Sequence, residues 1–210
     1  MNRSTLLFEV LALVAGIVSF NKYRKSVLFL FLPFLLYICI TEFLASTFYT
    51  CSNHLLFNPV LMMENGIFLF CFLYIFKSKL LREISKIIMI CFVIITLLDI
   101  WHLESFSQNV LSTSFNIGRI FILIEYFLYL IILLQSDDYL DLSRNLFFWA
   151  STGIFIFILM TFLRDTLLGL PSELTINEKY IIKMTGFIAS NILYSFFIIG
   201  FIRCKKIIHV

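Results

Sequence analysis

The sequence predicts an all-α, polytopic integral membrane protein with seven transmembrane helices. Of its 210 residues, 61% are hydrophobic and only 14% are charged, whereas soluble domains are about half apolar and about a quarter charged. The mean hydropathy is +1.00. The apolar residues fall into seven runs, each close to the roughly 20 residues that a helix needs to cross a bilayer.

The runs follow one another with short connections, so the sequence predicts a single transmembrane bundle domain over residues 1–210. The first run differs from a cleaved secretory signal because Glu9 interrupts it and its basic cluster follows the apolar stretch. Pro33 lies early in the second run and is expected to kink that helix. The predicted helices cover Thr5–Phe20, Val27–Phe48, Val60–Phe76, Ile87–Trp101, Phe115–Leu134, Leu146–Leu163 and Tyr180–Ile202.

The distribution of basic residues predicts that the N-terminus lies outside and the C-terminus inside. With this orientation, eleven lysines and arginines fall in inner segments and four in outer segments, as the positive-inside rule requires. The longest predicted connection, from Arg164 to Lys179, is outside. It is too short to form an independent module.

Ionisable residues lie within or at the ends of the predicted spans, and each costs about 2.5 to 3.5 kcal/mol at the bilayer centre on insertion scales. With the predicted topology they lie in the outer half of the bilayer, except Glu125, which lies near mid-depth. This common depth predicts a shared polar layer and a water-accessible pocket open to the outside. The candidate ligand-binding residues are Glu42, Glu64, Asp99, Arg119, Glu125, Arg164, Asp165 and Lys183.

A structural interpretation of these charges stands beside the functional one. Charged groups near helix ends extend to the lipid headgroups, and ion pairs hold helical bundles together. This role is favoured for the residues nearest the helix ends, which are Glu9, Arg164, Asp165 and Lys183. Both roles stay open for the deeper residues, which are Glu42, Asp99, Arg119 and Glu125.

The sequence predicts no catalytic residue, no cofactor and no metal site. Its three histidines, His54, His102 and His209, fall in separate segments, and the five cysteines show no metal-ligand spacing. The chain is therefore expected to be non-enzymatic. The enzymatic alternative is a membrane-embedded lipid hydrolase with Glu64 and Asp99 as its acid–base pair.

Five stretches of the chain resemble a group of small bacterial polytopic membrane proteins. They are Thr41–Phe43, Glu125–Tyr129, Asn145–Gly153, Ala189–Tyr194 and Arg203–Lys206. Some proteins of this type are encoded beside the RNA-guided, RNA-cleaving effector of type VI-B CRISPR loci. The resemblance implies a multi-pass accessory protein of the bacterial inner membrane that modulates antiviral defence. The resemblance assigns no functional residue to this chain.

The expected partners are the lipid bilayer, a cytoplasmic effector protein and further copies of the same chain. The effector is expected to contact the basic inner loops, represented by Lys77, Lys79, Arg82 and Lys86. Direct nucleic-acid binding is not expected, because the positive-inside rule already accounts for the basic inner face. The alternative function is an outward-facing polar pocket that uses intramembrane carboxylates to bind, transport or hydrolyse a small polar or lipid substrate.

Overall fold

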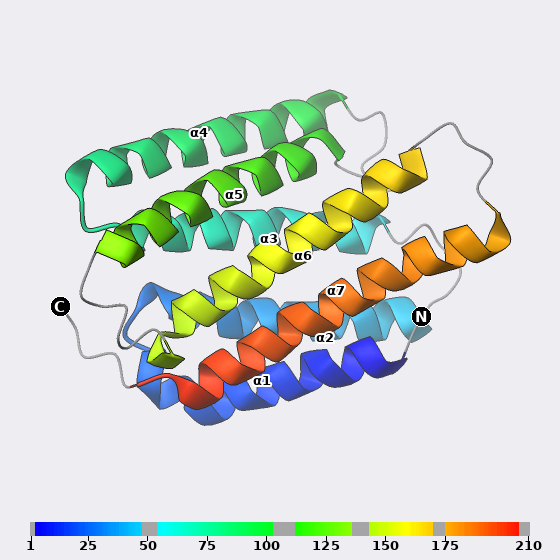
Figure 1. Ribbon diagram of the computed structural model, residues 1–210, viewed down its shortest axis with the longest axis horizontal. Helices are drawn as coiled ribbons and strands as arrows, with labels where there is room; N and C mark the ends of the chain where they lie inside the picture. Colours follow the sequence, from blue (N-terminus) through cyan, green and yellow to red (C-terminus); the bar gives the residue numbers. More distant parts are fainter. Residues whose placement is uncertain (1–2, 48–53, 103–111, 136–142, 170–174, 206–210) are drawn as a thin grey trace. The chain divides into compact units, whose positions relative to one another are not determined.

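A computed structural model describes residues 3–47, 54–102, 112–135, 143–169 and 175–205 (Figure 1). Helices make up 94% of it, and no strand occurs in these ranges. A 3₁₀ turn, η1, covers Val27–Leu30. The α-helices are α1 (Arg3–Tyr23), α2 (Phe31–Thr47), α3 (His54–Ile75), α4 (Lys79–His102), α5 (Ser112–Gln135), α6 (Leu146–Gly169) and α7 (Ile176–Arg203).

Seven helices in the described residues are long and apolar enough to span a membrane. This confirms the prediction of an all-α, multi-pass membrane protein, while the orientation of the termini stays a prediction. The exposed surface of α4 agrees with a lipid environment, because its large aliphatic residues point outward while Ser85 and Thr96 are buried. Such an arrangement is favourable where the surrounding solvent is hydrocarbon.

Several helices extend beyond the predicted runs, because an apolar run marks the lipid-crossing part and not the polar turns beyond it. Helix α3 begins six residues earlier than predicted and contains Pro59, so Glu64 is the eleventh of its 22 residues. The predicted start at Val60 placed Glu64 in the second turn of its helix, whereas the structure places it at mid-helix. Pro33 lies in the first turn of α2, where its missing N–H costs little, and η1 precedes that turn.

Two predicted loops are also partly helical. Lys79, Arg82 and Lys86 were expected in an inner loop, but they lie in the first turns of α4. The Lys86 ammonium pairs there with Glu83 Oε1 at 2.7 Å. The predicted outer loop from Arg164 to Lys179 is shorter than expected, because α6 continues to Gly169 and α7 begins at Ile176.

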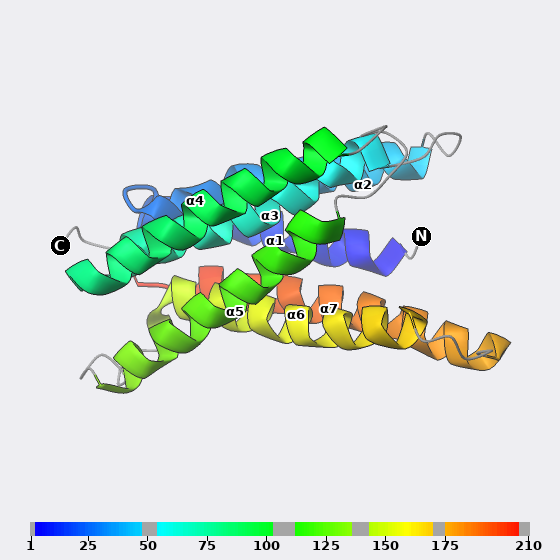
Figure 2. The ribbon, with the colours of Figure 1, turned by 90° about the horizontal axis from the view of Figure 1, so that it is seen from above.

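The chain forms two compact units. Among the described residues, the terminal unit contains α1 up to Lys22 together with α6 and α7, and the central unit contains η1 and α2–α5. Whether both belong to the single domain expected from the sequence stays a prediction. In the terminal unit α6 and α7 lie side by side and antiparallel (Figures 1 and 2). In the central unit α3, α4 and α5 contact one another, and α2 packs on α3.

Candidate functional site

The candidate site lies in the interior of the central unit, where one face of α4 carries three polar residues and a phenylalanine. This polar stripe consists of Ser85, Phe92 and Thr96, which are buried, and Asp99, which is half-buried. Their spacings of seven, four and three residues place all four on one helix face. Because α4 packs against α3 and α5, this stripe faces both helices.

Asp99 stabilises the start of α5. Its Oδ2 atom accepts hydrogen bonds from the backbone N–H and the hydroxyl of Ser114, each at 2.8 Å. Helix α5 begins at Ser112, so the N–H of Ser114 belongs to the first turn, which lacks acceptors within the helix. A carboxylate at this position satisfies that donor and also opposes the positive end of the helix dipole. Asp99 therefore has a structural role in joining α4 to α5.

Glu64, Asn65 and Arg119 form a buried polar cluster between α3 and α5. The Asn65 side-chain amide donates to the carbonyl oxygen of Phe115 at 3.3 Å. The Arg119 guanidinium lies 3.7 Å from the centroid of the Phe115 ring and acts electrostatically on Glu64. Within the described residues, Glu64 Oε1 and Asn65 Oδ1 are buried without a hydrogen-bond partner.

A narrow crevice lies beside this cluster. It is lined by Asn65 and Ser114 together with apolar side chains of all three helices. The apolar lining residues are Leu61, Met62, Phe92 and Phe115. The lining side chains leave no enclosed space wide enough for a water molecule, so a solute enters only if they move aside, and it would then meet the amide of Asn65.

Gly118 allows the three helices to approach closely at this level. A Cβ atom added to Gly118 would lie 2.5 Å from the Asn65 amide nitrogen and 2.8 Å from Cε2 of Phe92. Real Cβ atoms essentially never make contacts this short. The sequence reasoning missed both Asn65 and Gly118. The available signal was an amide directly after Glu64 and a glycine directly before Arg119, each inside an apolar run.

Glu125 forms a second polar position on α5, at the other side of Phe92 along α4. The side chain is fully buried, and the Ser85 hydroxyl of α4 acts on its carboxylate. The pair does not reach hydrogen-bond geometry, and among the described residues both oxygens of Glu125 and Oγ of Ser85 are buried without a partner. Glu125 is six residues beyond Arg119, or about 9 Å along the helix axis.

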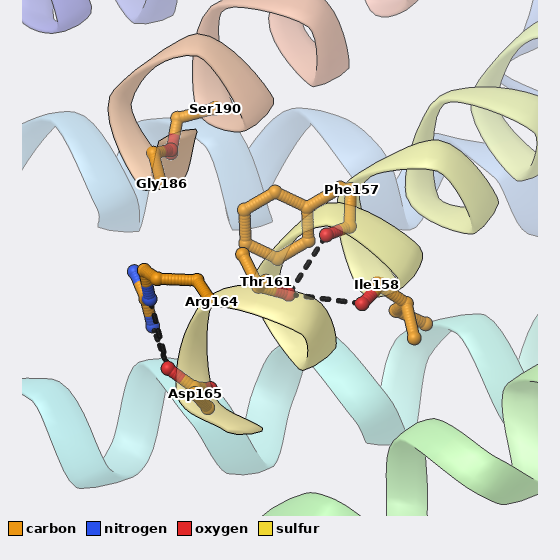
Figure 3. Close-up of polar contacts among 7 residues, drawn as sticks. All are labelled: Phe157, Ile158, Thr161, Arg164, Asp165, Gly186 and Ser190. Carbon is orange, nitrogen blue, oxygen red and sulfur yellow. Dashed lines mark hydrogen bonds and ion pairs between the residues drawn. The ribbon is translucent and has the colours of Figure 1, made fainter. Parts of the chain in front are cut away.

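The remaining predicted residues belong to α2 or to the terminal unit. Glu42 is half-buried near the end of α2. In the terminal unit, Arg164 Nε donates to Oδ1 of Asp165 at 2.8 Å (Figure 3), and the Arg164 side chain lies against Gly186 of α7. Lys183 belongs to α7, but its side chain is outside the description. The eight candidates are thus divided between two units, and their common layer stays a prediction.

The terminal unit also contains a buried thiol at its C-terminal end. The Lys22 ammonium donates to the carbonyl oxygen of Ile202 at 3.2 Å, which connects α1 to α7. Burial raises the pKa of the adjacent Cys204 thiol, while the charge of Lys22 lowers it. In the described part of the chain, no group of three or more His, Cys, Asp or Glu side chains is arranged to hold a metal ion.

Comparison of the chain with protein-family models, with curated proteins and with solved structures finds no match.

Proposed function

We propose that the chain is a non-enzymatic, multi-pass membrane protein that binds a small polar solute in the interior of α3–α5. The observation that carries this proposal is the pair of neighbouring buried acceptors, Glu64 Oε1 and Asn65 Oδ1, which have no partner in the described residues. An unsatisfied buried polar group costs about 1 to 3 kcal/mol. A solute in the crevice that carries hydrogen-bond donors would remove this cost at Asn65, the member of the pair that lines the crevice.

The geometry supports a solute with N–H donors. Both unpartnered atoms are hydrogen-bond acceptors, and the adjoining crevice is narrow. Arg119 supplies the opposite charge that offsets the cost of burying Glu64.

We propose that the crevice end of α4, near Asp99, faces outward in a bacterial inner membrane. The bias of basic residues toward the opposite ends of the helices supports this orientation.

Thermal unfolding of the purified full chain in detergent tests solute binding. We expect ammonium chloride to raise the Tm more than tetramethylammonium chloride at the same concentration, because only ammonium carries N–H donors. For a chain of this length, each kcal/mol of binding shifts the Tm by about 2 to 4 °C. The Asn65→Ala variant should lose the difference between the two salts, whereas Asn116→Ala, which changes an exposed amide on α5, should keep it. Equal shifts with both salts in the wild-type protein would contradict the proposal.

A second candidate function is that of an accessory protein in RNA-guided antiviral defence. The sequence resemblance described above and the exposed basic residues at the start of α4, Lys79 and Arg82 among them, support it. In the proposed orientation these residues are available to a cytoplasmic effector. We expect charge reversal of Lys77, Lys79, Arg82 and Lys86 to alter interference by a type VI-B effector in a phage assay, while Glu64→Ala is tolerated. Interference that is unchanged by the charge reversal would remove this candidate.

A further inference from the structure

We infer that the interior of α3–α5 conducts protons along the central unit, with Glu64 and Glu125 as carriers and the Phe92 ring as the barrier between them. This activity goes beyond solute binding at Asn65, because it requires Glu125 and Ser85, which do not line the crevice. Three observations support it: the length of the polar stripe, the unsatisfied groups along it, and the packing of Phe92.

The polar stripe is long enough to cross most of a membrane. Ser85 and Asp99 are 14 residues apart on one face of α4, which corresponds to about 21 Å of helix. The hydrocarbon core of a bilayer is about 30 Å thick. On α5, Ser114, Gly118 and Glu125 also share one face, at offsets of four and eleven residues. The stripes of α4 and α5 meet near one end at Asp99 and Ser114 and, farther along, at Ser85 and Glu125.

The unsatisfied groups lie at both levels of this stripe. Within the described residues, Glu64 and Asn65 hold unpartnered buried acceptors on α3, at the level where Asn65 and Phe92 both meet Gly118. Ser85 and Glu125 also hold unpartnered buried oxygens, Ser85 seven residues before Phe92 on α4 and Glu125 seven residues beyond Gly118 on α5. Intramembrane carboxylates are costly and mark ion pathways and proton relays. The charge of Arg119 acts on Glu64, and the Ser85 hydroxyl acts on Glu125.

Phe92 separates the two levels. It is seven residues from both Ser85 and Asp99, and its ring approaches the Cβ positions of Gly118 at 2.8 Å and Gly66 at 4.0 Å. The ring thus fills the space left by two glycines on the neighbouring helices. Because an aromatic ring neither accepts nor releases a proton, the structure represents a closed state, and movement of this ring is required for transfer.

The transfer step involves only O–H bonds. One carboxylate takes up a proton from the side of higher proton concentration and passes it, through water admitted by displacement of the ring, to the other carboxylate. The second carboxylate releases the proton on the opposite side. Each group returns to its initial state, and the transmembrane proton gradient or potential supplies the driving force.

Proton flux into liposomes tests this inference. The full chain is reconstituted with trapped pyranine, and a valinomycin-dependent potassium diffusion potential drives proton entry. We expect Phe92→Ala to increase the flux above that of the wild-type protein, and Glu125→Gln to abolish this increase in the double variant. Glu125→Asp should retain flux because it keeps a carboxylate. Glu83→Gln is the matched control, since Glu83 is an exposed carboxylate of α4 that pairs with Lys86.

Two results would overturn the inference. The first is flux equal to that of protein-free liposomes for both the wild-type protein and folded Phe92→Ala, and the second is full flux in the Phe92→Ala, Glu125→Gln double variant. If the Glu125→Gln variant does not fold, Ser85→Ala provides the same test in the Phe92→Ala protein. A reduced flux is expected, and an unchanged flux would contradict the role of Ser85 and Glu125. Glu125→Gln should keep the ammonium-dependent Tm shift, so solute binding and proton conduction can fail independently.

Discussion

Single residues set how closely the helices of the central unit approach. Gly118 leaves the volume that the Asn65 amide and the Phe92 ring occupy, and Asp99 holds the first turn of α5 through two hydrogen bonds to Ser114. These contacts position the crevice and the polar stripe. Substitutions at such positions therefore report on the site through stability before they report on any activity.

Replacing Gly118 by alanine tests the close approach. We expect Gly118→Ala to lower the free energy of unfolding by about 1 to 3 kcal/mol, because the new Cβ displaces Asn65 and Phe92 in a packed interior. Gly66→Ala is the control, since its nearest contact would be 4.0 Å away and alanine favours a helix by roughly 0.5 to 1 kcal/mol. Reversible SDS-induced unfolding in mixed micelles measures both. Equal effects of the two substitutions would show that Gly118 is not a packing constraint.

Asp99 provides a second test at this scale. Removing a charged acceptor that receives two hydrogen bonds should cost roughly 1.5 to 3 kcal/mol in Asp99→Ala. Asp99→Asn retains one oxygen acceptor and should cost less. The same unfolding measurement distinguishes them, and a neutral Asp99→Ala variant would argue against the capping role.

Individual helices follow two packing patterns. Helix α4 buries a narrow polar stripe and exposes aliphatic residues, as expected for a helix with lipid on most sides. Helices α6 and α7 instead form a tight antiparallel pair (Figure 1), in which Gly153 lies against Phe196 and Gly200 lies against Leu146 and Trp149. Small residues at membrane-helix interfaces increase van der Waals contact in this way.

The two glycines of the α6–α7 pair should respond differently to alanine. A Cβ at Gly153 would lie 2.7 Å from Cβ of Phe196, an atom held by the backbone, so we expect a loss of about 1 to 3 kcal/mol. A Cβ at Gly186 would instead meet the guanidinium of Arg164, the end of a flexible side chain that can move away. Gly186→Ala should therefore cost less than Gly153→Ala in unfolding measurements. The reverse order would contradict this account of the interface.

At the scale of the whole molecule, seven helices are long and apolar enough to cross a membrane, and the charge distribution predicts their orientation. If all seven helices cross, the basic residues gather on one side, and we expect the N-terminus outside and the C-terminus in the cytoplasm. A fluorescent protein fused after Val210 should fluoresce, and alkaline phosphatase fused there should be inactive. Truncated fusions within residues 103–111, on the predicted outer side, should give the opposite result. Active phosphatase after Val210 would show that the orientation is the opposite of the predicted one, with the crevice on the cytoplasmic side.

The sequence alone determined the all-α class and the seven helices that are long and apolar enough to cross a membrane, because burial of backbone polar groups in hydrocarbon requires long apolar helices whatever their neighbours are. It did not determine where those helices end, and so it placed Glu64 too near an end of α3. Lys79 and Arg82 were assigned to a loop for the same reason, since polar turns of a helix resemble loops in composition.

Only the tertiary structure decided which polar groups meet. The pairing of Asp99 with Ser114, the position of Asn65 at the crevice and the insertion of Phe92 between Gly66 and Gly118 depend on the rotation of α3, α4 and α5 about their axes. Spacing along one helix fixes which side chains share a face, but the partner of that face is set by side-chain packing between helices distant in sequence.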